Sequence, residues 1–359
     1  MRYIVIMAGG SGTRLWPLSR RDMPKQLLNL FQGTSLLRMA YQRIIGLVPD
    51  QRILVCTGMD YLGVVAETLP ELPADNLFGE PIGRDSLNAV AWPTAVLAQR
   101  DPQAVVAMIS ADHLIQPVDA YRAALDKAFA VAESNAQALV TLGVVPTSPH
   151  TGFGYLHRGE PVPGFSDTCR LRSFKEKPDS ATARAYLDSG DYWWNAGMFV
   201  FRAATMLQQL EILVPQGFSL VSELVRHPDR LAEIYPQLPK ISIDYAVLEP
   251  VAAGRGSAHV VAVGLPISWH DVGGFATLHD QLATDEQGNS VQGLAVAVDC
   301  HNNLVINSDS GGKLVAILGL SDMVVVQTEE ITLICPLTES ERIKELVARV
   351  IERRGQRYA

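Results

Sequence analysis

A glycine-rich segment near the N-terminus carries residues that can hold phosphate groups. The run from Ala8 to Ser19 reads A-G-G-S-G-T-R-L-W-P-L-S and follows an apolar run, Tyr3 to Met7. Glycines let successive backbone N–H groups converge on phosphate oxygens, because no Cβ blocks the approach. A strand-to-helix turn can also contain glycines for steric reasons alone. Arg14, which can form two parallel hydrogen bonds, and Lys25 downstream favour the phosphate-binding interpretation.

Two well-known phosphate-binding loops do not fit this segment. The P-loop pattern G-x-x-x-x-G-K-[ST] needs a lysine directly after a glycine, and no lysine stands at that spacing. The dinucleotide pattern G-x-G-x-x-G, started at Gly10, meets Leu15 where its third glycine should stand. The next apolar run ends at Cys56-Thr57-Gly58, without the acidic residue that would bind a ribose 2′-hydroxyl. The sequence therefore argues against an NAD-dependent dehydrogenase.

Short apolar runs alternate with helical patterns up to about residue 265. The runs are Tyr3 to Met7, Ile53 to Cys56, Ala104 to Ile109, Leu139 to Val144 and Met198 to Phe201. Segments that are apolar on both sides suit strands of a parallel sheet covered on both faces. Apolar residues at helical spacing lie between them, as in Leu36 to Ile44 and Tyr121 to Ala132. The alternation predicts an α/β fold with a doubly wound, mostly parallel, Rossmann-like sheet.

Asp112 comes just after the run Ala104 to Ile109, at the carboxyl end of a predicted strand, where α/β sheets place their sites. A carboxylate there can cap a helix or bind a hard cation such as Mg²⁺.

The pattern of apolar and turn residues changes after residue 284. Short β-rich pieces follow, separated by turn residues: Val291 to Val298, Asn303 to Ile306, Leu314 to Leu318, Met323 to Val326 and Ile331 to Ile334. Thr338-Glu339-Ser340-Glu341 has the pattern of a capping box, and the apolar residues from Ile343 to Ile351 repeat at helical spacing. We expect a domain of residues 1–284 and a small β-rich domain of residues 285–359 that ends in an amphipathic helix.

The amino-acid composition of the chain argues against some classes of binding partner. The chain of 359 residues has 30 basic and 38 acidic residues and a net charge of -8, which argues against a general positive field for nucleic acid or an anionic membrane. No apolar run reaches the roughly 18 residues that span a bilayer, and none resembles a signal peptide. The four cysteines are far apart, which argues against a zinc knuckle or a disulfide framework. We expect a cytoplasmic protein that binds neither nucleic acid nor membrane.

The run Ala8 to Ser19, followed by Met23-Pro24-Lys25-Gln26-Leu27, resembles the signature of the sugar nucleotidylyltransferase family, and its P-K-Q ending resembles mannose-1-phosphate guanylyltransferases. Further stretches match in order: Ala111 to His113, Pro146 to Tyr155, Phe174 to Pro178, Trp194 to Phe199, Ser242 to Val247 and Trp269 to Gly273.

The resemblance implies attack of a sugar 1-phosphate oxygen on the α-phosphorus of a nucleoside triphosphate, with pyrophosphate leaving. Such a reaction needs positioning and charge neutralisation more than a covalent nucleophile. Arg14 and Lys25 are the implied catalytic cations, and Asp112 and Asp271 the implied Mg²⁺ ligands. We interpret His113 as structural. The implied nucleotide-binding residues of the loop are Gly9, Gly10, Ser11, Gly12 and Thr13.

The implied residues for the sugar phosphate are Gly154, Glu176, Lys177 and Asn195. Lys177 would hold the phosphate and Glu176 the sugar hydroxyls. Lys175 could compete for the phosphate, but the alternation of side chains along a strand is taken to place it on another face.

Base recognition is assigned to Glu80 and Arg84, since a carboxylate can accept from both N1–H and the exocyclic amine of guanine. The chain departs from the family nearby: it reads Asp85-Ser86-Leu87-Asn88-Ala89 where guanylyltransferases usually read N-T-A-P-A, and Gly274-Phe275 replaces a usual Ser-Trp. A carboxylate at Asp85 would be electrostatically awkward near a nucleotide unless it faces a base amine or the metal.

The first hypothesis is GMP transfer from GTP to mannose 1-phosphate. The alternatives are another acceptor, such as a heptose 1-phosphate, another base, or a regulatory protein that binds a nucleotide sugar without turnover. The resemblance also implies that the C-terminal part is a short left-handed β-helix-like domain. We expect a homodimer and no second enzymatic activity.

Overall fold

The computed structural model describes residues 1–10, 12–31 and 33–359. Ser11, one of the predicted nucleotide-binding residues, lies outside the described residues. The chain forms two compact units. Unit 1 comprises Met1–Gly9, Ala40–Ala111 and Ile115–Trp269, and unit 2 comprises Gly10–Met39, Asp112–Leu114 and His270–Ala359. The units are therefore not continuous segments, and the predicted boundary after residue 284 stays a prediction.

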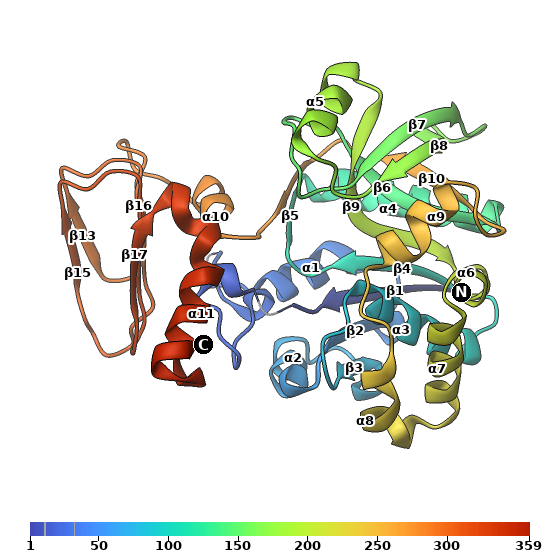
Figure 1. Cartoon of the computed structure of the whole chain (residues 1–359), viewed down its shortest axis with the longest axis horizontal. Coiled ribbons are helices and arrows are strands. Elements are labelled where there is room, and N and C mark those ends of the chain that lie inside the picture. The colour runs from blue at the N-terminus through green and yellow to red at the C-terminus, as the bar shows by residue number, and fades with distance from the viewer. Residues whose placement is uncertain (11, 32) are drawn as a thin grey trace. The chain divides into compact units, whose positions relative to one another are not determined.

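Unit 1 is built on a nine-stranded sheet of order β3-β2-β1-β4-β9-β6-β10-β8-β7 (Figure 1). Its strands are β1 (Arg2–Ala8), β2 (Ile53–Gly58), β3 (Leu77–Glu80), β4 (Val105–Ser110), β6 (Ala138–Val144), β7 (Tyr155–Pro161), β8 (Thr168–Lys175), β9 (Tyr192–Arg202) and β10 (His259–Gly264). Pairings on either side show that β9 and β8 run opposite to the other strands. The predicted α/β fold is confirmed, but the sheet is mixed, because these two strands make every pairing with their neighbours antiparallel. Met198 to Phe201, however, lies in an antiparallel strand, because an apolar run reports burial on both faces and not strand direction.

Helices cover both faces of this sheet. The core cluster under α3 (Ser86–Arg100), α6 (Ala203–Leu213) and α7 (Pro215–Arg226) takes Tyr3 and Val5 from β1. Ile4 and Ile6 are equally buried but point to the opposite face, because side chains alternate along a strand. Helix α4 (Val118–Ser134) packs on β4, β6, β9 and β10. The predicted βα alternation thus gives two apolar layers.

The remaining helical elements are short or lie at the rim. They are α1 (Leu36–Ile44), α2 (Leu62–Thr68), α5 (Ser180–Ser189), α8 (Leu231–Ile234), a π-helical turn (Asp244–Leu248), α9 (Glu249–Ala252), α10 (Phe275–Gln281), and 3-10 turns at Thr13–Leu15, Lys25–Leu27, Asp50–Arg52, Met59–Tyr61, Ala74–Asn76, Pro228–Arg230, Tyr235–Gln237, Leu337–Arg342 and Gln356–Tyr358. No helix of the described residues is both long and apolar enough to pass through a membrane.

The C-terminal strands of unit 2 stack as parallel coils. They are β12 (Ser290–Gln292), β13 (Ala295–Val298), β14 (Leu304–Asn307), β15 (Val315–Leu318), β16 (Met323–Gln327) and β17 (Thr332–Pro336). One sheet has the order β12-β14-β16-β17 and the other pairs β13 with β15. All pairs are parallel except β16 with β17. This is the predicted β-helix-like arrangement.

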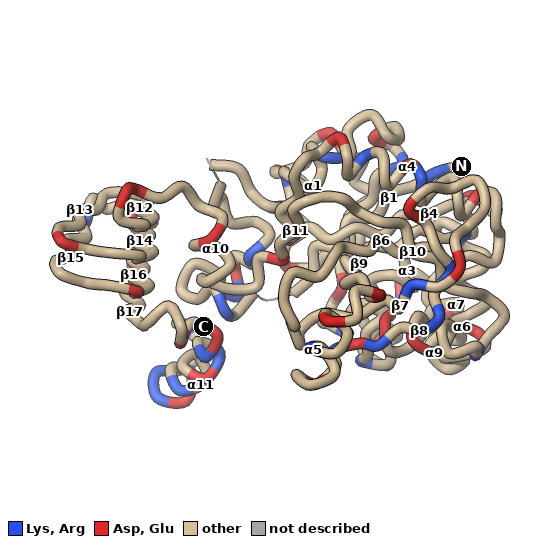
Figure 2. Tube along the Cα trace, turned by 90° about the horizontal axis from the view of Figure 1, so that it is seen from above, with Lys and Arg blue, Asp and Glu red and all other residues tan. Residues whose placement is uncertain are grey.

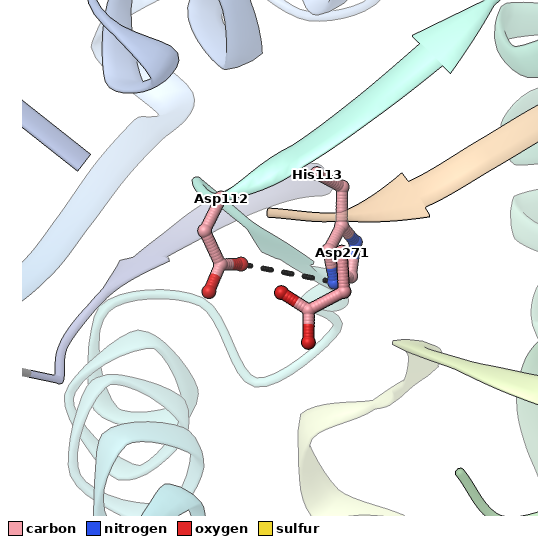
Figure 3. Close-up of side chains that lie close together, drawn as sticks. All are labelled: Asp112, His113 and Asp271. Atoms are coloured by element: carbon pink, nitrogen blue, oxygen red, sulfur yellow. Dashed lines mark ion pairs between the residues drawn. The ribbon is translucent and has the colours of Figure 1, made fainter. Parts of the chain in front are cut away.

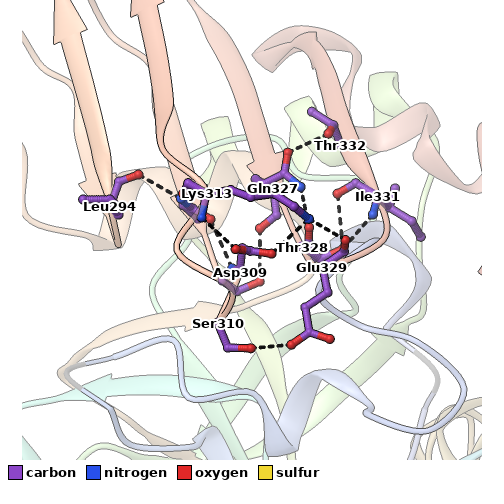
Figure 4. Close-up of polar contacts among 11 residues, drawn as sticks. Leu294, Asp309, Ser310, Lys313, Gln327, Thr328, Glu329, Ile331 and Thr332 are labelled. Carbon is purple, nitrogen blue, oxygen red and sulfur yellow. Dashed lines mark hydrogen bonds and ion pairs between the residues drawn. The ribbon is translucent and has the colours of Figure 1, made fainter.

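Side-chain hydrogen bonds hold the turns of these coils. Asn307 Nδ2 donates to the carbonyl oxygens of Leu294 and Lys313, and Asp309 Oδ2 accepts from Lys313 N (Figure 4). The β-rich piece Val291 to Val298 contains parts of two strands with a corner at Gly293, whose φ is 82°. A Cβ at Gly293 would overlap the carbonyl oxygen of Asn307.

The predicted terminal helix exists as α11 (Ile343–Arg354), and Ile343 and Val347 lie in the core of unit 2. The predicted capping box is wrong. Residues 337–342 form a 3-10 helix, and no side chain caps α11 at Arg342. Ser340 Oγ donates instead to Leu337 O. Since the turn is wound more tightly than an α-helix, the capping-box geometry does not arise. Figure 2 shows basic and acidic residues along α11.

Gly293→Ala is expected to destabilise the β-helix-like domain more than Gly319→Ala. Both glycines have positive φ, but no atom lies within 4 Å of a Cβ at Gly319. Gly319→Ala, the control, should therefore lose only about 1–2 kcal/mol of unfolding free energy, from backbone strain at positive φ. Gly293→Ala should lose roughly 1–3 kcal/mol more, from overpacking. Chemical denaturation of both variants measures the difference, and equal losses would contradict the steric explanation.

Candidate active site

The glycine-rich loop leaves β1 and turns through left-handed backbone. Gly10 has φ 97° and Gly12 has φ 58°, and Gly12 precedes the 3-10 turn Thr13–Leu15. A Cβ at Gly12 would lie 2.6 Å from Lys25 Cβ and 2.9 Å from Ser19 Oγ. Gly12 is therefore needed both for the turn and for the close approach of Lys25.

Lys25 lies between the two aspartates that the sequence assigns to the metal. Its Nζ is 2.6 Å from Asp112 Oδ2 and 3.5 Å from Asp271 Oδ1, and it donates to Val272 O at 3.2 Å. The Lys25 side chain is only 12% exposed. Val272 N donates to Asp112 O, which holds the two aspartate-bearing segments side by side. The structure thus brings together Lys25, Asp112 and Asp271 from three distant parts of the sequence.

The charges of this cluster stabilise one another. Burial alone would lower the pKa of Lys25, but the charges of Asp112 and Asp271 outweigh it and raise this pKa. Burial would raise the pKa of Asp112, whereas the neighbouring Lys25 lowers it, and the net shift is downward. Both shifts favour the charged forms, as expected for a buried ion pair.

His113 lies beside the aspartates. Its Nε2 is 3.7 Å from Asp112 Oδ1. Asp112, His113 and Asp271 each offer one possible metal-ligand atom, and these three atoms lie within 4.8 Å of one another (Figure 3). The sequence interpretation treats His113 as structural. Its position next to Asp112 in the motif was the signal that could have included it.

Arg14 occupies the surface of the same unit. Its Nη1 lies 3.4 Å from Glu341 Oε2 and 3.4 Å from Gly273 O. The side chain is 38% exposed, so solvent and a ligand can reach it. Glu341 does not appear among the predicted site residues.

Glu80 and Arg84 lie in unit 1. The Glu80 carboxylate is buried, and its Oε1 accepts a short hydrogen bond from the Tyr235 hydroxyl. Burial raises the pKa of Glu80, although this hydrogen bond opposes the shift. Glu80 Oε2 lies 3.6 Å from the Cβ position of Gly9, so this oxygen points toward the loop glycine. Arg84 donates to Pro236 O.

The residues that depart from the family pattern hold the chain around residues 236–243. Asn88 Nδ2 donates to Arg84 O and Pro239 O, both at 2.8 Å, and Ser86 Oγ accepts from Ile243 N. Asp85 is exposed at the start of α3 with φ 59°. These contacts give Ser86 and Asn88 a structural role.

All four predicted sugar-phosphate residues come together in unit 1. Asn195 N donates to Gly154 O at 2.8 Å, and a Cβ at Gly154 would overlap Glu176 Oε2. Lys177 Nζ lies 3.1 Å from Glu176 Oε1. Asn195 Nδ2 donates to Asp244 Oδ1 at 2.8 Å. Asp244 therefore belongs to this cluster, and the motif Ser242 to Val247 was the signal for it.

Lys175 and Lys177 pair with different carboxylates, but the reason that the sequence suggests for their different roles is wrong. The two lysines are two positions apart, so strand alternation would place them on the same face. The alternation does not extend to Lys177, because β8 ends at Lys175 and Lys177 has left-handed backbone with φ 43°. Lys175 Nζ pairs instead with Glu249 Oε1 at 3.2 Å.

The carboxylates of this cluster favour protonation. Burial, together with the nearby charge of Glu176, raises the pKa of Asp244 to about 7. Burial also raises the pKa of Glu176, and the adjacent Lys177 partly offsets it. A polar group that binds here meets carboxyl groups that can donate as well as accept.

Comparison with known proteins decides the family. A nucleotidyl transferase family model matches residues 3–288. The mannose-1-phosphate guanylyltransferases of Klebsiella pneumoniae and Escherichia coli are each 37% identical to the chain, over 96% of it and 72% of each relative. The chain belongs to the mannose-1-phosphate guanylyltransferase family of nucleotidyl transferases. The resemblance that the sequence motifs indicate is confirmed.

Similarity to a solved structure extends over nearly the whole chain. A solved structure described as mannose-1-phosphate geranyltransferase from Thermus thermophilus is similar with a TM-score of 0.85 and 34% identity, over 97% of this chain and 99% of that one. A second family model, the MannoseP isomerase/GMP-like beta-helix domain, matches residues 293–350. This match agrees with the parallel coils of β12 to β16.

Asp244→Asn is expected to reduce the pH dependence of stability. A carboxyl group with a raised pKa binds more protons in the folded state, so stability falls as pH rises from the unfolded pKa, about 4, toward 7. The parent should therefore lose roughly 1–3 kcal/mol more unfolding free energy between pH 5 and pH 8 than the variant does. Chemical denaturation at both pH values measures this.

Asp229→Asn is the control, because Asp229 is exposed on the surface and should leave the pH dependence unchanged. Parallel pH profiles for the parent and Asp244→Asn would contradict the raised pKa.

Proposed function

We propose that the chain transfers GMP from GTP to mannose 1-phosphate and releases pyrophosphate. The observation that carries this proposal is the convergence of Lys25 with Asp112 and Asp271 in unit 2, next to a loop that contains Arg14. Two carboxylates and two cations in one place suit phosphoryl chemistry, which needs charge neutralisation more than a nucleophilic side chain. Family membership supports the same reaction.

The two aspartates suit Mg²⁺. Their oxygens are hard ligands, and the ammonium group of Lys25 already stands in for a cation between them. Asp271 Oδ1 is buried, and its contact with Lys25 Nζ, at 3.5 Å, is longer than a normal hydrogen bond, so a metal could replace that contact. When bound, Mg²⁺ would neutralise charge on the triphosphate and the leaving pyrophosphate. Asp112 and Asp271 would hold it.

The loop residues bind the triphosphate in this proposal. The backbone N–H groups of Gly9, Gly10, Ser11, Gly12 and Thr13 are the proposed phosphate donors. Arg14 and Lys25 offset charge on the β- and γ-phosphates. An oxygen of the sugar phosphate attacks the α-phosphorus, and the bond from that phosphorus to the pyrophosphate oxygen breaks. The side chains only orient and neutralise the reacting groups.

Lys177 binds the sugar phosphate, and Glu176, Asn195 and Gly154 surround the sugar. Lys177 is half-exposed and lies against the buried Glu176, so it can exchange that carboxylate for a phosphate. Asn195 is fixed by Thr141 Oγ1 and Asp244, both at 2.8 Å, which supports a defined orientation toward hydroxyl groups. Such fixed donors and acceptors can distinguish epimeric sugars.

Glu80 selects guanine. Tyr235 holds one carboxylate oxygen, and the other points toward Gly9. A carboxylate in this position can accept from guanine N1–H and the exocyclic amine. Arg84 acts by fixing the chain at Pro236. Another base, another sugar 1-phosphate such as a heptose 1-phosphate, and a regulatory protein without turnover are the alternatives that the assay below separates.

We also propose a cytoplasmic homodimer with domains of residues 1–284 and 285–359. The four cysteines are free, which suits a reducing compartment. The family matches end at residue 288 and resume at residue 293, close to the proposed boundary. The outer face of β13 and β15 supports the dimer, because its side chains are exposed and apolar. It comprises Leu294, Val296, Val298, Leu314, Ala316 and Leu318.

Pyrophosphate release measured over a matrix of GTP, dTTP, UTP, ATP and CTP with several sugar 1-phosphates tests the reaction. We expect the highest rate with GTP and mannose 1-phosphate, and none without a divalent cation. Asp112→Asn and Asp271→Asn should each reduce turnover by at least about 100-fold, because each removes a metal ligand.

Asp271→Asn distinguishes loss of a metal ligand from misfolding, because Lys25 keeps its shorter contact with Asp112 in that variant. Mn²⁺ binding followed by electron paramagnetic resonance gives a readout besides activity. Equal rates with GTP and dTTP would remove Glu80 from base selection. Binding of GDP-mannose without pyrophosphate release from any pair would favour the regulatory alternative.

Leu318→Glu is expected to convert the dimer to a monomer. In a two-fold symmetric interface each face meets its own copy, so the substitution brings like charges together and buries them. Light scattering after gel filtration should give twice the chain mass of 39.1 kDa for the parent and 39.1 kDa for the variant. Ile212→Glu, another exposed apolar residue, is the control in unit 1. A monomeric parent would refute the dimer.

A further inference from the structure

Glu341 contacts Arg14, although the two residues are far apart in the sequence. Glu341 Oε2 lies 3.4 Å from Arg14 Nη1 in unit 2. Glu341 belongs to the 3-10 helix Leu337–Arg342, just before α11. Nearby, Glu339 and Glu345 both bind Arg342. Glu341 is therefore the carboxylate of this segment that turns toward the glycine-rich loop.

Gly274 leaves room for this contact. Its φ of -168° is extended backbone, which any residue can adopt. A Cβ on Gly274 would lie 2.9 Å from Glu341 Oε1, and one on Gly273 would lie 2.9 Å from Arg14 Nη1. The two glycines thus make the surface on which the guanidinium and the carboxylate meet. A side chain at position 274 would therefore push the exposed carboxylate of Glu341 aside and would not strain the backbone.

The Arg14–Glu341 contact differs from the Lys25 cluster in strength. Arg14 is 38% exposed and Glu341 61% exposed, whereas Lys25 is 12% exposed. An exposed ion pair at 3.4 Å is weak because water and salt screen it. Arg14 can therefore exchange Glu341 for another anion at little cost.

We propose that Glu341 is a positioning residue that holds Arg14 in the nucleotide-free enzyme and competes with the triphosphate for its guanidinium. This inference rests on the proposed role of Arg14 in triphosphate binding. The carboxylate keeps the guanidinium over Gly273 and Gly274 until the phosphates arrive. Because it also places a negative charge beside the bound triphosphate, it weakens the binding of GTP and of pyrophosphate.

Glu341→Gln should bind GTP and pyrophosphate about two- to fivefold more tightly than the parent, as loss of a weak exposed ion pair allows. Isothermal titration calorimetry with GTP and Mg²⁺, without the sugar phosphate, measures this. In turnover, the KM for GTP should fall by the same factor while kcat does not rise. The gain should shrink at high salt. Gly274→Ala, which displaces Glu341 Oε1 without straining the backbone, should act in the same direction.

Glu339→Gln is the matched control, since it removes the same charge two residues away and should leave the affinity for GTP unchanged. Arg14→Gln alone should weaken GTP binding at least about tenfold, because a charge-assisted contact is lost. In the Arg14→Gln background, Glu341→Gln should have no further effect.

Two results would overturn the inference. The first is unchanged GTP affinity in Glu341→Gln while Arg14→Gln is impaired. The second is an equal gain from Glu341→Gln in the Arg14→Gln background, which would mean a general charge effect that does not act through Arg14. Normal GTP binding by Arg14→Gln would refute the proposed role of Arg14 itself, and this inference with it.

Discussion

The ammonium group of Lys25 lies 2.6 and 3.5 Å from the carboxylates of Asp112 and Asp271, and unit 2 depends on this contact. The unit is assembled from three separate stretches, and each supplies one member of the cluster. A buried charge is tolerated only with a partner, so the three stretches must meet in this arrangement. The apolar cluster that includes Leu15, Leu114 and Val272 joins the same stretches. Structural and catalytic requirements therefore fall on the same residues.

The cations of the proposed site are held with different strengths. Lys25 is buried between two carboxylates, whereas Arg14 meets one exposed carboxylate and Lys177 meets Glu176 while half-exposed. Screening by water makes the Arg14 contact easy to replace, so a phosphate ligand can recruit Arg14 with little loss. Recruitment of Lys177 also takes the ion-pair partner from the buried Glu176 carboxylate. For Lys25, the same exchange requires that another cation compensate the two aspartates, which links triphosphate binding to the metal.

Much of the fold follows from local pattern, because apolar runs, helical spacing and turn residues report burial directly. The order of motifs also identified the residues that come together around Lys25 and around Asn195. Features that depend on tertiary contacts were missed. The direction of β9 is invisible in an apolar run, and the tight winding of residues 337–342 prevents the capping box. Glu341 could not be found, because nothing local marks a surface carboxylate that pairs with a residue far away in the sequence.

The glycines around the site show how a charged side chain can determine its neighbours. Gly12 has left-handed backbone, and its Cβ would also lie 2.6 Å from Lys25 Cβ. Gly274 is extended, and the atom that its Cβ would approach, Glu341 Oε1, is the end of an exposed side chain that can move aside. The requirement for glycine is therefore strict at position 12, where backbone conformation and space both demand it, and weak at position 274. Phosphate approach, the reason that the sequence suggests for the loop glycines, is joined at Gly12 by the space that Lys25 needs.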